Sequence, residues 1–121
     1  MILGLRTAIY PVGDLAAARD WYCRVVGVDP YFDQPFYVGF NVGGFEPGLV
    51  PDGHPGTAGP QPLWGVADAA AALARLVELG AQPLDAVAEV GEGIKVAAVL
   101  DPFGNRFGFI ENPHFDPRAM R

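Results

Sequence analysis

Residues 12–30 read VGDLAAARDWYCRVVGVDP, and residues 66–83 repeat the same plan as VADAAAALARLVELGAQP. Each stretch has an aspartate before an alanine-rich segment (Asp14, Asp68) and a glycine after it (Gly27, Gly80). An aspartate accepts hydrogen bonds from the free amides of a first helical turn, and glycine suits the left-handed position beyond the last turn. Apolar residues recur at spacings of three and four, so each stretch predicts a helix with one buried face.

Strand-like runs surround both predicted helices. One run precedes each helix, and two or three follow it, at residues 5–12, 36–42, 45–50, 61–66, 86–90, 94–100 and 106–111. Turn-forming GG, GEG and DPFGN separate these runs, and PDGHPGTAGP links the two halves. The order of strand, helix and further strands, twice over, predicts an α+β fold in which a curved sheet carries helices on its convex side.

The length of 121 residues predicts a single domain, with module one at about 1–55, module two at about 59–113 and a C-terminal tail at 114–121. The one cysteine, Cys23, excludes an internal disulfide and fits a reducing compartment. Neither a signal peptide nor a membrane span is expected at the N-terminus, so we expect a cytoplasmic protein with no membrane partner. The net charge of −6 and the single lysine, Lys95, leave no basic cluster for nucleic acid.

The repeated plan, with IYPVGDLAAARDWY at residues 9–22 and DPFGNRFGFIENP at residues 101–113, resembles the vicinal oxygen chelate superfamily. This superfamily includes glyoxalase I, the extradiol dioxygenases and the bleomycin-resistance proteins. The resemblance implies paired βαβββ modules that form a cup-shaped mixed sheet with the helices on its convex face. It also implies a homodimer with a small-molecule ligand bound inside the cup.

Enzymes of this superfamily hold a divalent metal with four side chains, typically histidines and glutamates. The resemblance places these positions on Thr7, Gly48, Gln61 and Gly108. Two of the four have no side chain, and the other two offer neutral oxygens, whereas zinc, magnesium and calcium need at least some nitrogen, thiolate or anionic oxygen donors. We therefore expect no metal and no other cofactor.

Strand alternation predicts which residues face the cup. Phe36, Val38, Phe40 and Val42 are expected to face the helices. The other side is expected to carry glycines, which either leave volume for a ligand or allow curvature and close backbone approach: Gly39, Gly48, Gly65 and Gly108. The polar residues among them are the candidate ligand-binding set, namely Thr7, Tyr37, Asn41, Glu46, Gln61 and Arg106.

Among the acids, Glu46 is the one candidate catalytic base. It lies two residues from Gly48, so alternation puts it on the cup side, although Pro47 between them permits a bulge. Glu111 lies three residues beyond Gly108, which predicts the opposite side and a solvated strand end. The two histidines, His54 and His114, have no partner at a metal-binding spacing and are expected in loops.

These residues predict a metal-free protein that binds or sequesters a small organic molecule. Two alternatives stay open. One is a glyoxalase-like lyase, isomerase or dioxygenase that uses a displaced metal site or Glu46 as a base. The other is a non-catalytic dimeric interaction protein.

Overall fold

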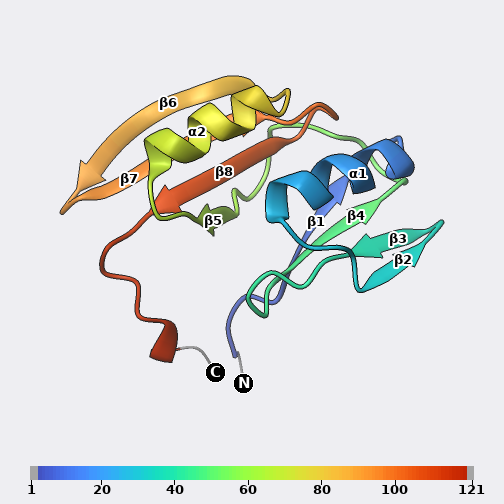
Figure 1. Ribbon diagram of the computed structural model, residues 1–121, viewed down its shortest axis with the longest axis horizontal. Coiled ribbons are helices and arrows are strands. Elements are labelled where there is room, and N and C mark those ends of the chain that lie inside the picture. Colours follow the sequence, from blue (N-terminus) through green and yellow to red (C-terminus); the bar gives the residue numbers. More distant parts are fainter. Residues whose placement is uncertain (1–2, 120–121) are drawn as a thin grey trace.

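The computed structural model describes residues 3–119 and contains the same order of elements twice, a strand, a helix and three strands (Figure 1). The first module consists of β1 (Thr7–Pro11), α1 (Leu15–Val26), β2 (Phe32–Gln34), β3 (Tyr37–Gly39) and β4 (Glu46–Val50). The second consists of β5 (Leu63–Gly65), α2 (Ala69–Glu78), β6 (Gln82–Gly91), β7 (Ile94–Leu100) and β8 (Arg106–Glu111). A short 3-10 helix follows at Pro117–Ala119. The predicted α+β fold of two βαβββ modules is confirmed.

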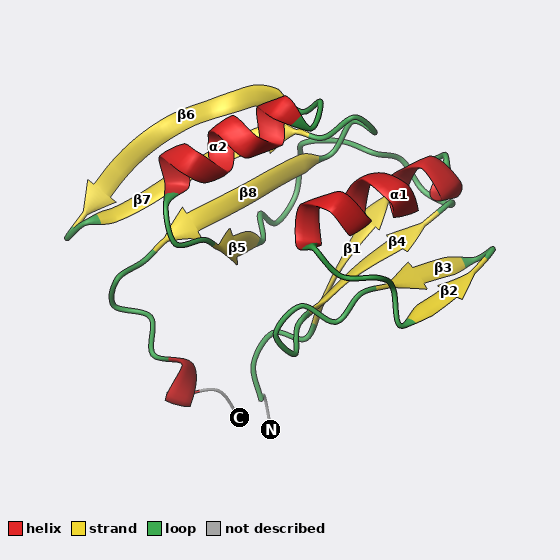
Figure 2. Cartoon of the chain, in the orientation of Figure 1, coloured by secondary structure: helices red, strands yellow, loops and turns green. Residues whose placement is uncertain are grey.

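Each module forms its own four-stranded mixed sheet (Figure 2). The strand orders are β1-β4-β3-β2 and β5-β8-β7-β6, and no strand pair among residues 3–119 joins the two sheets. In both, the strand before the helix pairs in parallel with the last strand of the module, and the other pairs are antiparallel. Helix α1 packs over β3 and β4, and α2 packs over β6, β7 and β8. We call the opposite side of each sheet the helix-free face; the cup shape stays a prediction.

The predicted helix ends are confirmed. Asp14 Oδ1 accepts a hydrogen bond from the Ala17 amide at 3.0 Å, and Asp68 Oδ1 accepts one from the Ala71 amide at 3.1 Å. Gly27 ends α1 at φ +76°, in the left-handed region that glycine adopts without a steric penalty. No helix among the described residues is long and apolar enough to cross a membrane.

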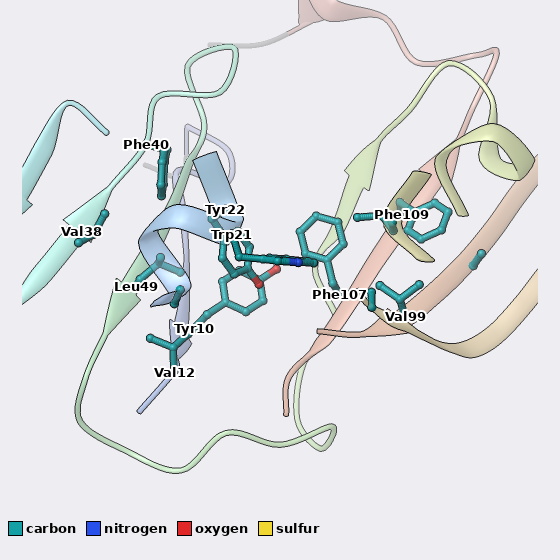
Figure 3. Close-up of a cluster of buried hydrophobic side chains, with 14 of the residues drawn as sticks. Tyr10, Val12, Trp21, Tyr22, Val38, Phe40, Leu49, Val99, Phe107 and Phe109 are labelled. Atoms are coloured by element: carbon teal, nitrogen blue, oxygen red, sulfur yellow. The ribbon is translucent and has the colours of Figure 1, made fainter. Parts of the chain in front are cut away.

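An aromatic core joins the two modules (Figure 3). The Tyr10 ring from β1 lies 5.8 Å from the Tyr22 ring of α1 and 6.4 Å from the Phe107 ring of β8. Trp64 Nε1 donates to the Tyr10 hydroxyl at 2.9 Å, and Trp21 Nε1 donates to the Leu79 carbonyl at 2.9 Å. Both indole groups are therefore satisfied, and each bond links one module to the other.

The DPFGN segment, residues 101–105, is a turn that fastens the second module to the first. Asp101 Oδ1 accepts from the Phe103 and Asn105 amides at 2.9 Å, and Asp101 Oδ2 accepts from the Tyr22 hydroxyl at 2.7 Å. Burial raises the pKa of Asp101 and raises the pKa of Tyr22 well above its ordinary value. The side-chain Nδ2 of Asn105 donates to the Pro11 carbonyl at 2.6 Å.

The first sheet differs from the predicted one in two ways. The run at residues 36–42 forms a strand only at Tyr37–Gly39, and a further strand, β2, precedes it. Val38 and Phe40 are buried as predicted, but the Phe36 prediction is wrong because this residue is 65% exposed. Phe36 lies in the two-residue turn between β2 and β3, where strand alternation no longer applies.

Candidate functional site

The helix-free face of the first sheet carries Glu46. Thr7 pairs with Glu46, and the register continues unbroken through Pro47 to Gly48. Leu49, which alternates with Glu46 and Gly48 along β4, is fully buried in the core. Because paired residues in neighbouring strands point to the same side of a sheet, Thr7, Glu46 and Gly48 share the helix-free face.

Two tyrosines hold the Glu46 carboxylate. The Tyr31 hydroxyl donates to Glu46 Oε1, and the Tyr37 hydroxyl donates to Glu46 Oε2. The hydrogen bond to Glu46 raises the pKa of Tyr31, while burial, together with the bond to Glu46, raises the pKa of Tyr37. Both phenols therefore stay protonated at neutral pH and remain donors to the carboxylate.

Tyr37 reaches Glu46 across Gly48 and Gly39. A Cβ at position 48 would collide with the Tyr37 hydroxyl, and a Cβ at position 39 would lie 3.1 Å from the Tyr37 ring and 3.2 Å from the Glu46 carboxyl carbon. The space above these two glycines is thus filled by the protein's own side chains. It is not the open volume for a ligand that one of the two sequence interpretations offered.

The same arrangement occurs in the second sheet. A Cβ on Gly108 would lie only 2.7 Å from Leu63 Cδ2, so the β5 side chain covers this glycine. Gly65 alone among the four glycines has no neighbouring atom within 4 Å of a Cβ position, and it is exposed. The close approach of the Leu63 side chain therefore explains why a glycine stands at position 108. Gly65, in contrast, faces open space.

A small hollow of about 170 Å³ lies beside Glu46. Its lining comes from the start of β4, the turn before it and the residue before β2, namely Tyr31, Phe40, Asn41, Gly44, Phe45 and Glu46. The Asn41 side chain accepts a hydrogen bond from the Gly44 amide at 2.9 Å, so its oxygen holds the turn that forms one wall.

A larger hollow of about 500 Å³ lies where the linker between the modules passes the ends of β1 and β8. Gln61, Arg106 and His54 are among its polar lining residues, and prolines and Ile9 supply much of the rest. The Arg106 guanidinium forms an ion pair with Asp85 of β6. Its Nε atom is buried and has no hydrogen-bond partner among the described residues.

The six candidate ligand-binding residues thus fall into two groups rather than one site. Asn41 and Glu46 line the small hollow, and Tyr37 bonds to Glu46. Thr7 lies opposite Glu46 in the sheet and is exposed. Gln61 and Arg106 line the larger hollow at the module junction.

The four positions that the superfamily resemblance assigns to a metal do not fit one. Thr7 and Gln61 are exposed neutral side chains, while Tyr37 and Leu63 cover Gly48 and Gly108. No group of three or more histidine, cysteine, aspartate or glutamate side chains in residues 3–119 is placed to hold an ion. A dication needs anionic or imidazole donors, and these positions supply none.

Glu111 lies on the side of α2, opposite Gly108, as predicted. The predicted solvation of its carboxylate is wrong. Its Oε1 accepts a hydrogen bond from the Ala69 amide at 2.8 Å, at the start of α2. Glu111 is therefore a partly buried partner of a helix N-terminus rather than a solvated strand end. His54 and His114 lie in exposed loops, as predicted, and burial raises the pKa of Cys23, which keeps its thiol protonated.

Sequence reasoning missed two residues of these sites. Tyr31, which bonds to Glu46, lies outside any strand, so alternation gives it no side. Asp85 on β6 forms an ion pair with Arg106 on β8, with β7 between the two strands. Only the pairing register of the strands brings these two residues together.

Comparisons with known proteins agree with the fold. The profile of the Glyoxalase/Bleomycin resistance protein/Dioxygenase superfamily matches residues 4–109. A glyoxalase/bleomycin resistance protein from Catenulispora acidiphila is 26% identical and has a TM-score of 0.63, over 91% of this chain and 100% of its own. No curated protein matches the sequence.

Two further solved structures share the architecture. A glyoxalase-related enzyme from Fulvimarina pelagi has a TM-score of 0.74 at 21% identity, over 93% of this chain and 90% of its own. TioX from Micromonospora sp. ML1 has a TM-score of 0.68 at 21% identity, over 89% of this chain and 98% of its own. The profile covers most of the sequence, and the βαβββ order repeats in both halves. The chain therefore belongs to the Glyoxalase/Bleomycin resistance protein/Dioxygenase superfamily.

Proposed function

We propose that this protein binds and sequesters a small organic molecule on its helix-free side and uses no metal to do so. The observation that carries the ligand site is the hollow of about 500 Å³ at the module junction, and the covering of two glycines argues against a metal. Where the resemblance places metal ligands on β4 and β8, Gly48 lies under the Tyr37 phenol and Gly108 under the Leu63 side chain. These groups favour contacts with an organic molecule over coordination of an ion.

Two hollows support a ligand of this kind. The junction hollow, of about 500 Å³, is within the range of small-molecule sites and combines apolar walls with a few polar groups. The hollow beside Glu46 is smaller and carries an oriented carboxylate. A ligand that used either hollow would gain apolar contact together with directional hydrogen bonds.

We propose further that the protein is a cytoplasmic homodimer. Large apolar side chains are exposed on several elements of the described chain, including Ile9 on β1, Leu63 on β5 and Val90 on β6. A second copy that covered them would remove apolar surface from water. Size-exclusion chromatography with light scattering tests this: a mass near 26 kDa, about twice the 12.9 kDa of the chain, is expected, and a monomer at micromolar concentration contradicts it.

Elemental analysis and a thermal-shift screen test the proposed function together. We expect substoichiometric divalent metal after gentle purification, no change in melting temperature after dialysis against a chelator, and stabilisation by a planar or aromatic compound. A stoichiometric metal whose removal by chelator lowers the melting temperature would overturn the proposal. A metal-dependent superfamily member carried through the same purification controls for metal lost on the column.

The position of Glu46 favours one alternative, a metal-free enzyme with this carboxylate as its base. Glu46 faces the helix-free side beside a hollow, as a base must if a substrate is to reach it. Both of its oxygens already accept tyrosine hydroxyls, which leaves fewer lone pairs for a proton from substrate. For any turnover found with glyoxalase-type substrates, a Glu46→Gln variant with unchanged kcat removes Glu46 as the base.

A further inference from the structure

We propose that the hollow beside Glu46 binds the cationic group of an organic ligand, an ammonium or guanidinium carried on an apolar body. This inference rests on the proposed small-molecule function and assigns a chemical class to the ligand of one hollow. It follows from the charge at the hollow, from the rings around it and from its size.

The hollow contains one carboxylate, that of Glu46. None of the five ion pairs formed within residues 3–119 includes Glu46. The partners of its carboxylate are instead two neutral phenols, which orient the group without cancelling its charge. A carboxylate has about four lone-pair sites, so two remain for a donor that enters the hollow. A cationic donor forms the stronger, charge-assisted bond there.

Aromatic side chains bond to this carboxylate and line the hollow: Tyr31 and Tyr37 donate to it, and Phe40 and Phe45 are among the lining residues. Tyr31 is 64% exposed, so part of its ring is open to a ligand in the hollow. The Phe32 ring lies 6.0 Å from the Tyr37 ring and 5.9 Å from the Phe36 ring, in edge-to-face arrangements. Aromatic faces carry partial negative charge and attract ammonium and guanidinium groups. The apolar body of the ligand would cover the exposed rings at the same time.

The size of the hollow limits what enters it. Its volume of about 170 Å³ is below the roughly 300–1,000 Å³ of sites that take a whole drug-sized ligand. This accommodates a charged head group of a few non-hydrogen atoms rather than a whole drug-sized molecule. The net charge of −6 adds a field that raises the local concentration of cations and disfavours anions.

Three probes with one phenyl ring separate charge from shape: 2-phenylethylammonium, 2-phenylethanol and phenylacetate. Each is titrated into ¹⁵N-labelled protein, and binding is followed by the amide shifts of Gly44, Phe45 and Glu46. We expect the ammonium to bind at this hollow at least about tenfold more tightly than the alcohol, and phenylacetate not to bind there. The preference should shrink as salt rises from about 0.02 to 0.5 M, because salt screens an exposed charge.

Glu46→Gln removes the charge and keeps the side-chain shape, so the preference for the ammonium over the alcohol should disappear. Glu89→Gln removes the same charge from exposed β6 in the second sheet and should leave the preference unchanged. Tyr37→Phe keeps the charge and frees one carboxylate oxygen, so the preference should persist. Thermal melts verify that each variant folds, and the salt titration of the wild-type protein tests the charge without any variant.

Equal binding of ammonium and alcohol at these amides would overturn the cation inference while leaving small-molecule binding intact. Binding of phenylacetate there, or of no probe at all, would also overturn it. Failure of the proposed function itself has a different signature, namely a chelator-sensitive stoichiometric metal. The two failures are therefore distinguishable.

Discussion

Replacing Gly48 by alanine should destabilise the protein through Tyr37. Gly48 is buried in β4, and the added methyl group would occupy the place of the Tyr37 hydroxyl. Neither Pro47 nor Leu49 on each side is exposed, so β4 has little room to shift away. The phenol must swing out, and its hydrogen bond to Glu46 is then lost.

The magnitude follows from two opposing contributions. A hydrogen bond to a charged group contributes about 1.5–3 kcal/mol. Alanine in place of glycine stabilises by about 0.4–1 kcal/mol, because the unfolded chain loses freedom. The net loss in the free energy of unfolding at Gly48→Ala is therefore roughly 1–2 kcal/mol. Gly65→Ala is the matched control, since its methyl group meets no atom within 4 Å, and it should be neutral or stabilising.

Urea denaturation followed by tryptophan fluorescence measures both free energies. In a Tyr37→Ala background the obstacle is gone, so Gly48→Ala should become as harmless as Gly65→Ala. If Gly48→Ala costs the same in both backgrounds, Tyr37 is not the cause and the reasoning is refuted. If Gly48→Ala is as stable as Gly65→Ala in the wild-type background, the close approach itself is refuted.

Three further changes test other parts of the structure. Burial raises the pKa of Asp101 above its usual value of 3.8, so the stability that this group contributes is complete below pH 3.8 and is lost as pH rises through the raised pKa. The unfolding free energy of the wild-type protein minus that of Asp101→Asn should therefore fall as pH rises above about 4. A difference that does not change with pH contradicts this. Glu111→Ala removes a partner of the α2 N-terminus and should cost about 1 kcal/mol in urea titrations, against nearly nothing for Glu89→Ala; equal costs would contradict the contact. Phe36→Ala should lower the free energy of unfolding by under about 0.5 kcal/mol, and Phe40→Ala should lower it by about 3–5 kcal/mol. A large loss for Phe36→Ala would show that Phe36 packs in the core, as the sequence predicted.

Local sequence patterns predicted the elements well because their causes are local. The aspartate caps and closing glycines act within one helical turn, so Asp14 and Gly27 could be assigned from spacing alone. The side-chain direction of Val38 follows from alternation within its strand, and this residue is buried as predicted. Alternation failed where a strand stops, as it does just before Tyr37, which left Phe36 exposed.

The sequence by itself determined the repeated order of strand, helix and further strands, the helix ends and the turn at residues 101–105; the resemblance added the βαβββ modules and the four superfamily positions that lack metal-binding donors. Only the tertiary structure decided that Tyr31 and Tyr37 meet at Glu46, and that Tyr37 and Leu63 cover Gly48 and Gly108. The physical reason is the distance along the sequence between the residues that interact. Capping and alternation depend on neighbours a few residues apart, whereas these contacts depend on the register between strands, which packing of the whole module sets.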